Sequence, residues 1–276
     1  MSYIEQLFGL KDVTAVVTGG TGVLPKAMAG YLASAGAKVS IWGRGTRRPV
    51  EEEVEDLRKE LADKGIEAEL DGQQVDTGDE AATQAALEAT AAALGAPNVL
   101  INGVGGNKGK GPFVDIDTKT FSEVLDMNLL AGLVIPTKVF ARYWQSQGIA
   151  ASIINLASMT SYTPLSGVWA YDAAKSATLS LTQATAKEFA KDKIRVNAIA
   201  PGFFVGHQNR ALLIANNETG ELTERGQSII DRTPFGRFGE PADLEGATVF
   251  LASPKASGFL TGVCIPVDGG FLIDNI

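Results

Sequence analysis

Short apolar runs alternate with longer helical patterns along the whole of this chain. Seven short runs, most of them rich in β-branched residues, predict strands at residues 13–18, 38–42, 67–75, 98–103, 152–156, 194–200 and 263–267. Apolar residues at helical spacing predict helices at residues 24–35, 50–64, 79–94, 129–147, 171–191 and 241–252. This alternation predicts an α/β fold: a doubly wound, Rossmann-type parallel sheet of about seven strands with helices on both faces.

No Pro- or Ser-rich linker divides the pattern, so residues 1–276 are predicted to form a single dinucleotide-binding and catalytic domain. Residues 203–232 lie between the strand predicted at 194–200 and the helix predicted at 241–252, and they are rich in polar residues and glycine. A segment of that length inside a compact domain is typical of a lid or binding loop. We therefore predict a substrate lid at residues 203–232.

Composition narrows the class of protein. The net charge of −8 argues against nucleic-acid binding as the main role. The one cysteine, Cys264, cannot form an internal disulfide, which fits a reducing cytoplasm. The N-terminus shows no secretion signal, and no uncharged apolar run reaches the ~18 residues of a membrane span. We expect a cytoplasmic protein that acts on a small molecule, without nucleic-acid or membrane partners.

One predicted helix carries a tyrosine and a lysine four residues apart, Tyr171 and Lys175. Residues i and i+4 share a helix face, which places an ammonium beside a phenol. A free phenol titrates near pKa ~10 and is a poor acid or base at neutral pH. The cation is expected to lower the pKa of Tyr171 towards the working pH. Ser158 lies 13 positions before Tyr171, just beyond a predicted strand.

A glycine-rich turn, Thr18-Gly19-Gly20-Thr21-Gly22, follows the first predicted strand. Such a turn lets a pyrophosphate approach the backbone, where free N–H groups and the helix dipole favour anions. From about residue 10 to 271 the chain resembles the short-chain dehydrogenases/reductases, with further matching pieces at Asn102-Gly103-Val104-Gly105, Asn128, Asn197-Ala-Ile-Ala-Pro-Gly202 and Val267-Asp-Gly-Gly270. Residues 202–204, 208–213, 222–225 and 233–241 are most similar to the D-mannonate oxidoreductase (fructuronate reductase)-like subgroup.

This resemblance implies an oxidoreductase with the catalytic residues Asn128, Ser158, Tyr171 and Lys175. Tyr171 exchanges a proton with the substrate oxygen, and Ser158 orients and polarises that oxygen. Lys175 lowers the pKa of the tyrosine and bonds the nicotinamide ribose, while Asn128 supports Lys175 through a water. Structural roles are also compatible with the sequence: a strand-end turn for Ser158, a helix cap for Asn128 and a packed ring for Tyr171.

The resemblance also implies a cofactor site made of Thr18, Gly19, Thr21, Gly22, Val23, Leu24, Gly43, Arg44, Asp76, Asn102, Gly103, Tyr171, Lys175, Pro201, Gly202 and Phe204. NAD-specific members carry an acid at the end of the second strand, where this chain has Gly43. Because Arg44, Arg47 and Arg48 follow, NADP(H) is favoured over NAD(H). These arginines are also compatible with a solvated stretch, and Asp76 with a helix cap.

On the substrate side, the candidate residues are Asn107, Lys108, Ser158, Met159, Tyr171, His207, Asn209 and Arg210. Cations and amides suit a polyhydroxylated acid, because guanidinium binds carboxylate bidentately. The predicted substrate is the secondary alcohol or ketone of a sugar acid or polyol, of the D-mannonate/D-fructuronate kind. Lys108 is equally compatible with a solvated loop charge. His207 has no second His or Cys at ligand spacing, so no metal site is predicted.

Two other functions stay open. A carbonyl reductase of another ketone, such as a 3-oxoacyl thioester, calls for an apolar, open cleft. A non-catalytic nucleotide-binding protein gains support from Pro25, which stands at the family's last glycine of the turn and removes a backbone donor beside the pyrophosphate. The complete set of Asn, Ser, Tyr and Lys residues favours the enzyme.

The predicted helix at residues 171–191 is apolar over more than one face, with Ala173, Ala177, Leu181 and Ala184 among its residues. One face is expected to cover the sheet and another to meet a two-fold partner. In the resembled family this helix and the one corresponding to 129–147 commonly pack against copies of themselves. The C-terminal residues also end apolar, which suits a subunit contact. We expect a homotetramer, with a dimer as the second choice.

Overall fold

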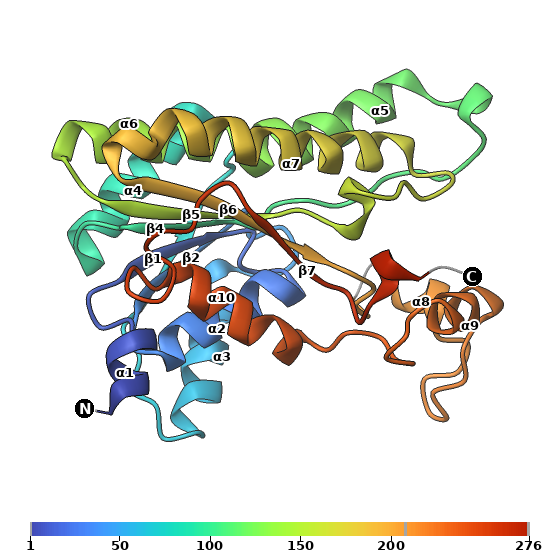
Figure 1. The fold of residues 1–276 in the computed structure, drawn as a ribbon, viewed down its shortest axis with the longest axis horizontal. Coiled ribbons are helices and arrows are strands. Elements are labelled where there is room, and N and C mark those ends of the chain that lie inside the picture. Colours follow the sequence, from blue (N-terminus) through green and yellow to red (C-terminus); the bar gives the residue numbers. More distant parts are fainter. Residues whose placement is uncertain (1, 207–208, 275–276) are drawn as a thin grey trace.

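The structure is a computed structural model, and it describes residues 2–206 and 209–274. Seven strands form one sheet in the order β3-β2-β1-β4-β5-β6-β7, and every neighbouring pair is parallel. Their bounds are Thr14–Thr18 (β1), Lys38–Gly43 (β2), Leu70–Gln74 (β3), Val99–Asn102 (β4), Ala151–Leu156 (β5), Ile194–Pro201 (β6) and Cys264–Val267 (β7). The strand order reverses between β1 and β4, which confirms the predicted doubly wound fold (Figure 1).

Helices cover both faces of the sheet (Figure 1). One layer contains α1 (Tyr3–Phe8), α2 (Val23–Ser34), α3 (Val50–Ala62) and α10 (Glu245–Ala252). The other contains α4 (Glu80–Leu94), α5 (Thr118–Leu125), α6 (Ile135–Gln147) and α7 (Trp169–Phe189). The short helices α8 (Arg210–Leu213) and α9 (Glu224–Asp231) lie together at one end of the molecule.

The core is divided by the sheet into two apolar layers. Because a parallel sheet is buried on both faces, its central strands are rich in apolar residues, and every residue of β1 is buried. In the layer under α4, α6 and α7, Trp42 packs on Phe140 and Phe140 on Trp144, with ring centroids 5.5 and 5.4 Å apart. The Trp144 indole N–H donates to the Pro97 carbonyl, so this large side chain is buried without an unsatisfied donor.

The helix predicted at residues 129–147 is the second part of a longer one. It begins at Thr118, where the Asp117 carboxylate caps the helix by accepting from the Thr120 N–H at 3.0 Å. By length and composition alone this helix could cross a membrane, with a mean hydropathy of 1.5, yet half of its most apolar window is buried in the fold. Its apolar character therefore reflects its place against the sheet.

Within this long helix, residues Asp126–Val134 form a π-helical segment, η2. The wider turn frees carbonyls from their usual partners, and the Thr77 hydroxyl donates to one of them, the Ala131 carbonyl, at 2.8 Å. Gly132 lets the chain after β4 come close, since a Cβ there would stand 2.5 Å from the Val104 carbonyl oxygen. The π-helical segment therefore fixes the helix against the ends of β3 and β4.

Residues 203–232, predicted as a lid, contain α8 and α9 and a bridge between Ile214 and Leu222. The predicted strand and helix positions otherwise agree with the structure to within a few residues, whereas α1 and α5 were not predicted.

Candidate active site

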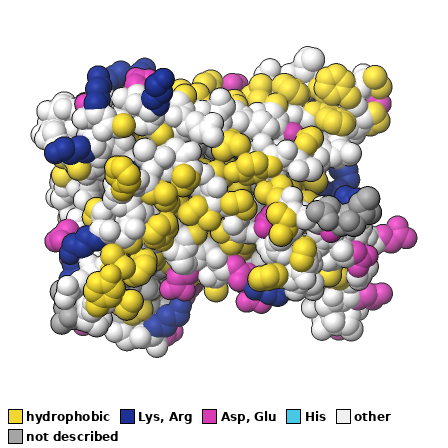
Figure 2. Space-filling view, viewed as in Figure 1, with side chains coloured by type: hydrophobic (Ala, Val, Ile, Leu, Met, Phe, Trp, Pro, Cys, Tyr) yellow, Lys and Arg dark blue, Asp and Glu magenta, His cyan; other side chains and the backbone are white. Residues whose placement is uncertain are grey.

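A cleft of about 1260 Å³ opens at the carboxyl ends of the strands. Its walls come from the glycine-rich turn after β1, the ends of β2, β5 and β6, the loop after β4, the start of α7 and the α8–α9 segment. In Figure 2 the surface is hollowed between the part containing α5 and the part containing α8 and α9, with Lys or Arg side chains beside the hollow. The glycine-rich turn, the loop after β4 and the residues Ser158, Tyr171 and Lys175 all line this cleft.

The turn after β1 packs backbone to backbone on the end of β4. Gly19 has φ +64°, and a Cβ there would stand 2.8 Å from the Gly103 carbonyl oxygen. A Cβ on Gly103 would stand 2.5 Å from the Thr18 carbonyl oxygen and 2.8 Å from Cγ of Pro25. Both glycines are therefore required by close approach, as a pyrophosphate-binding turn demands.

Pro25 is accommodated without loss of a helical hydrogen bond. It lies in the first turn of α2, where backbone N–H groups have no intrahelical acceptor, and the first N–H bond along the helix runs from Lys26 to the Gly22 carbonyl at 2.9 Å. Its ring lines the cleft beside Gly103. The N–H groups of Val23 and Leu24 precede it at the start of the helix and remain available to an anion.

Ser158, Tyr171 and Lys175 meet in the cleft. The Lys175 ammonium lies 5.6 Å from the centre of the Tyr171 ring, one helical turn away. Ser158 precedes the short helix η3 (Met159–Ser161), where its hydroxyl accepts from the Thr160 N–H at 3.2 Å, and it lies close enough to the Tyr171 phenol to lower its pKa. This contact puts two hydroxyls at one point of the cleft, the arrangement needed to hold a carbonyl oxygen.

The pKa of Tyr171 beside Lys175 differs from the value expected from the sequence. Burial raises the pKa of the Tyr171 phenol, the hydrogen bond with Ser158 opposes that effect, and the neighbouring Asp172 raises the pKa further. Burial lowers the pKa of Lys175 to about 8. The prediction that Lys175 brings the pKa of Tyr171 down is therefore wrong for this structure, because the cost of burying a phenolate is larger.

A phenol with a raised pKa is protonated at neutral pH and is a proton donor. The Lys175 ammonium donates instead to the Leu156 carbonyl at the end of β5, at 2.7 Å. This bond fixes the side chain beside the phenol while only 5% of the residue is exposed. The arrangement suits reduction of a ketone, in which the site must deliver a proton to the developing alkoxide.

Asn128 lies in the π-helical segment and supports the wall of the cleft. Its side-chain N–H groups donate to the carbonyls of Gly106, at 2.7 Å, and Val124, at 2.8 Å. Its oxygen accepts from the Gly106 N–H at 3.2 Å. Asn128 does not itself line the cleft. Its amide thus holds the loop after β4, and a Cβ on Gly105 in that loop would stand 3.4 Å from the Lys175 nitrogen.

At the far end of the cleft, beyond β2, the three predicted arginines have different environments. Arg48 is held by Asp56 at 2.7 Å and by Glu52 at 3.2 Å, and it does not line the cleft. Arg44 and Arg47 line the cleft, and no acidic side chain in the described parts of the chain forms an ion pair with either. Asp76 also lines the cleft while its carboxylate accepts from the Gly78 N–H at 2.9 Å.

Three predicted site residues face away from the cleft. The Thr18 hydroxyl accepts from the Gly103 N–H at 3.1 Å and joins β1 to β4. Asn102 is buried, and its amide donates to Thr137 and Asn155 at 2.9 and 2.8 Å. Arg210 donates to Asn217 at 2.7 Å within its own segment. None of these three residues lines the cleft, because local bonds turn each side chain elsewhere, and their contact with a ligand stays a prediction.

Fourteen further predicted residues line the cleft, namely Gly19, Thr21, Gly22, Val23, Leu24, Gly43, Gly103, Asn107, Lys108, Met159, Pro201, Gly202, Phe204 and Asn209. Lys108 is paired with Glu123 at 3.0 Å, and the Asn209 amide bonds the backbone of Phe204 and Gly206 at 2.8 and 2.7 Å. The prediction for His207 falls outside the described residues. Two cations that line the cleft, Lys110 and Arg225, were not predicted, although both stand in polar segments of the sequence.

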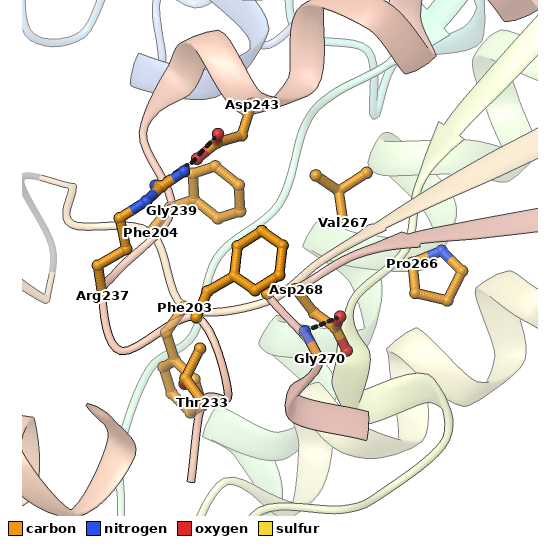
Figure 3. A pocket seen from close by; sticks show the side chains of 12 residues that line it. Phe203, Phe204, Thr233, Arg237, Gly239, Asp243, Pro266, Val267, Asp268 and Gly270 are labelled. Carbon is orange, nitrogen blue, oxygen red and sulfur yellow. Dashed lines mark hydrogen bonds and ion pairs between the residues drawn. The ribbon is translucent and has the colours of Figure 1, made fainter. Parts of the chain in front are cut away.

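A second cavity, of about 370 Å³, adjoins the cleft behind Phe203 and Phe204, which line both (Figure 3). Its charged groups are already paired. Arg237 binds Asp243 through two bonds of 2.7 and 2.8 Å, and the Asp268 carboxylate accepts from the Gly270 and Leu272 N–H groups. It contains none of the candidate catalytic residues, and among the described residues no three His, Cys, Asp or Glu side chains gather as metal ligands.

The fold and the cleft define a dinucleotide-dependent oxidoreductase, and comparison with known proteins agrees. A family model described as enoyl-(acyl carrier protein) reductase matches residues 24–272. A 2-dehydro-3-deoxy-D-gluconate 5-dehydrogenase from Formosa agariphila is 35% identical over 266 residues, which cover 96% of this chain and 95% of that protein. The chain belongs to the short-chain dehydrogenase/reductase family and uses NAD or NADP to oxidise or reduce at a CH–OH group.

Two crystal structures of similar proteins contain a bound nicotinamide cofactor. One, from Haemophilus influenzae, is of a protein assigned as a D-mannonate oxidoreductase with bound NAD, with a TM-score of 0.85, 34% identity and 99% of each chain covered. The other is a gluconate 5-dehydrogenase from Burkholderia cenocepacia in complex with NADP and tartrate, with a TM-score of 0.83, 29% identity and 98% of each chain covered. Relatives of this fold therefore bind either nicotinamide cofactor.

Proposed function

We propose that this enzyme interconverts the secondary alcohol and the ketone of a sugar acid or related polyol of the D-mannonate/D-fructuronate kind. The observation that carries the proposal is the meeting of Ser158 and Tyr171 in a cleft whose substrate side is polar and cationic. The loop after β4 brings Asn107, Lys108 and Lys110 to that side. Relatives named for 2-dehydro-3-deoxy-D-gluconate and gluconate support the same class of substrate.

In this proposal the cleft's own residues hold the substrate and move one proton. The Ser158 and Tyr171 hydroxyls bind the substrate oxygen, and the Tyr171 phenol donates its proton as charge develops there. Lys175, fixed by the Leu156 carbonyl, stabilises the resulting phenolate. Asn128 acts as a positioning residue through the loop at Gly106. The bound nicotinamide supplies or accepts the hydride.

For the cofactor we propose NADP(H) as the preferred partner. Arg44 and Arg47 line the adenosine end without an acidic partner, so their guanidinium groups are free to hold a 2′-phosphate. Gly43, which takes the place of an acid, packs under Thr21: a Cβ there would stand 2.8 Å from Cγ2 of that threonine. The glycine therefore serves close packing as well as removing a negative charge, and Asp at this position requires Thr21 to move.

We further propose that residues 1–276 act as a single cytoplasmic domain whose segment 203–232 closes over the substrate. Residues 205, 206, 209, 212 and 225 of that segment line the cleft, which supports a role as a lid. Leu212 is exposed at the cleft and would gain a partner on closure.

The experiment for the substrate class compares turnover of D-fructuronate, the neutral ketose D-fructose and a 3-oxoacyl thioester by the purified protein with NADPH. The proposal predicts the highest kcat/KM for the sugar acid. Preference for the thioester would instead establish the rival carbonyl reductase, and binding of NADPH without turnover of any ketone would establish a non-catalytic nucleotide-binding protein.

We propose a homotetramer, with a dimer as the second choice. Small side chains, Ala173, Ser176, Ser180 and Ala184, lie exposed along the outer face of α7, which lets a second copy of the helix approach closely. A band of hydrophobic side chains also crosses the face of the molecule where β7 and α10 lie (Figure 2). Two separate faces on one chain, one of small side chains and one hydrophobic, suit the two kinds of two-fold contact of a tetramer.

Light scattering at micromolar concentration is expected to give the mass of four chains of 28.9 kDa each. Ala177→Arg, on the same outer face of α7, should reduce the mass to that of a dimer, because a buried unpaired cation opposes helix packing. A wild-type monomer would contradict the proposal.

A further inference from the structure

Six cationic side chains line the cleft: Arg44, Arg47, Lys108, Lys110, Lys175 and Arg225. The first two belong to the adenosine end, beyond β2. Lys175 donates to the Leu156 carbonyl beside Tyr171, and Lys108 is paired with Glu123 at 3.0 Å. Of these six cations, all among the described residues, only Lys110 and Arg225 are therefore unpaired and away from the adenosine end.

Arg225 stands at a position that the backbone defines closely. The preceding Thr223 joins the start of α9 to α8: its N–H donates to the Leu213 carbonyl at 3.0 Å and its hydroxyl to the Leu212 carbonyl at 2.8 Å. The same hydroxyl caps α9 by accepting from the Gly226 N–H at 2.9 Å. Gly226 itself lies so close to Leu213 that no Cβ fits there. The backbone at Arg225 is therefore fixed on both sides, by the contacts of Thr223 and of Gly226.

The placement of this arginine has an electrostatic cost. A cation in the first turn of a helix is disfavoured by the helix dipole, which favours anions there. Arg225 is half-buried, and no acidic side chain in residues 2–206 and 209–274 forms an ion pair with it. Lys110 differs, since it is exposed and its stem rests against Gly167, where a Cβ would stand 3.0 Å from the Lys110 Cγ. Of the two, Arg225 has the better-defined position.

We propose that Arg225 binds the carboxylate of the substrate and so determines which carbon of a sugar acid reaches Ser158 and Tyr171. The inference rests on the proposed function. A guanidinium presents two parallel N–H donors to a carboxylate, and a half-buried one loses less of the interaction to water than an exposed lysine. Because Arg225 lies in the segment proposed to close, an acid in the cleft also gives α9 a partner of opposite charge.

The test compares wild type, Arg225→Gln and Arg225→Lys with NADPH and either D-fructuronate or the neutral ketose D-fructose. Arg225→Gln is expected to raise the KM for the acid about 10- to 100-fold and to leave kcat/KM for the ketose unchanged, because one charge-assisted contact is lost. Arg225→Lys should restore part of the loss. Arg232→Gln, at the other end of α9, is the matched control and should behave as wild type.

The role of Arg225 and the proposed function are contradicted by different results. If wild type prefers the acid and Arg225→Gln keeps that preference, or if the variant loses both substrates equally, the role of Arg225 is wrong while the proposed function stands. If wild type shows no preference for the acid over the ketose, the proposed function falls and the role of Arg225 with it. Calorimetric titration of tartrate into NADP-loaded protein adds a readout independent of turnover, with weaker binding expected for Arg225→Gln only.

Discussion

Tyr171→Phe is expected to reduce turnover by about 10²- to 10⁴-fold while cofactor binding persists, because the change removes only the hydroxyl that transfers the proton. The phenol lies beside Ser158 in the cleft, and its raised pKa keeps it protonated at neutral pH. The measurement is kcat for ketone reduction, together with the dissociation constant of NADPH from fluorescence.

Tyr162→Phe provides a matched control for that variant. Tyr162 follows η3, does not line the cleft and hydrogen-bonds Cys264, so its hydroxyl is chemically similar but lies outside the cleft. Its loss should leave kcat unchanged. Turnover by Tyr171→Phe close to that of wild type, or equal losses in the two variants, would show that the Tyr171 phenol is not the proton donor.

The second large effect concerns the cofactor. Replacing Arg44 and Arg47 together by Ala is expected to weaken NADPH binding about 10- to 100-fold and to leave NADH binding unchanged, because only NADPH carries the 2′-phosphate. Both arginines line the cleft and have no acidic partner among the described residues. The measurement is the dissociation constant of each cofactor by fluorescence titration.

Arg48→Ala supplies the comparison, since that guanidinium is already held by Asp56 and Glu52 on the surface. It should alter neither dissociation constant. Equal weakening of NADPH and NADH in the double variant would mean that Arg44 and Arg47 bind the pyrophosphate or shape the cleft, and the proposed preference for NADP(H) would be withdrawn.

The fold was predictable because each strand of a parallel sheet is buried on both faces and therefore forms a distinct apolar run, as in β1. The helix from Thr118 was only partly predictable. Its first part, α5, spans only eight residues and buries only Val124, so it offers a short apolar signal. The π-helical segment was not predicted either; there Gly132 lies against the chain after β4, a tertiary contact that periodicity does not report.

Within the site, motif positions could be predicted but side-chain directions could not. Asn102 belongs to a matching motif, yet its side chain points into the sheet and bonds Thr137. The pKa of Tyr171 depends on how much of the phenol is buried, which helical spacing to Lys175 does not report. Arg225 could have been proposed as a cation of the polar segment 203–232, but its access to the cleft depends on how α9 packs on α8.

The central claim is that the cleft reduces the ketone of a sugar acid with hydride from NADPH and a proton from Tyr171. The most direct test is transfer of label from NADPH carrying deuterium at the reactive carbon of the nicotinamide to D-fructuronate, with the product analysed by mass spectrometry. The account predicts a hydroxy acid with one deuterium on the carbon that bears the new hydroxyl, formed by wild type and far more slowly by Tyr171→Phe. Absence of labelled product with wild type that binds NADPH would contradict it.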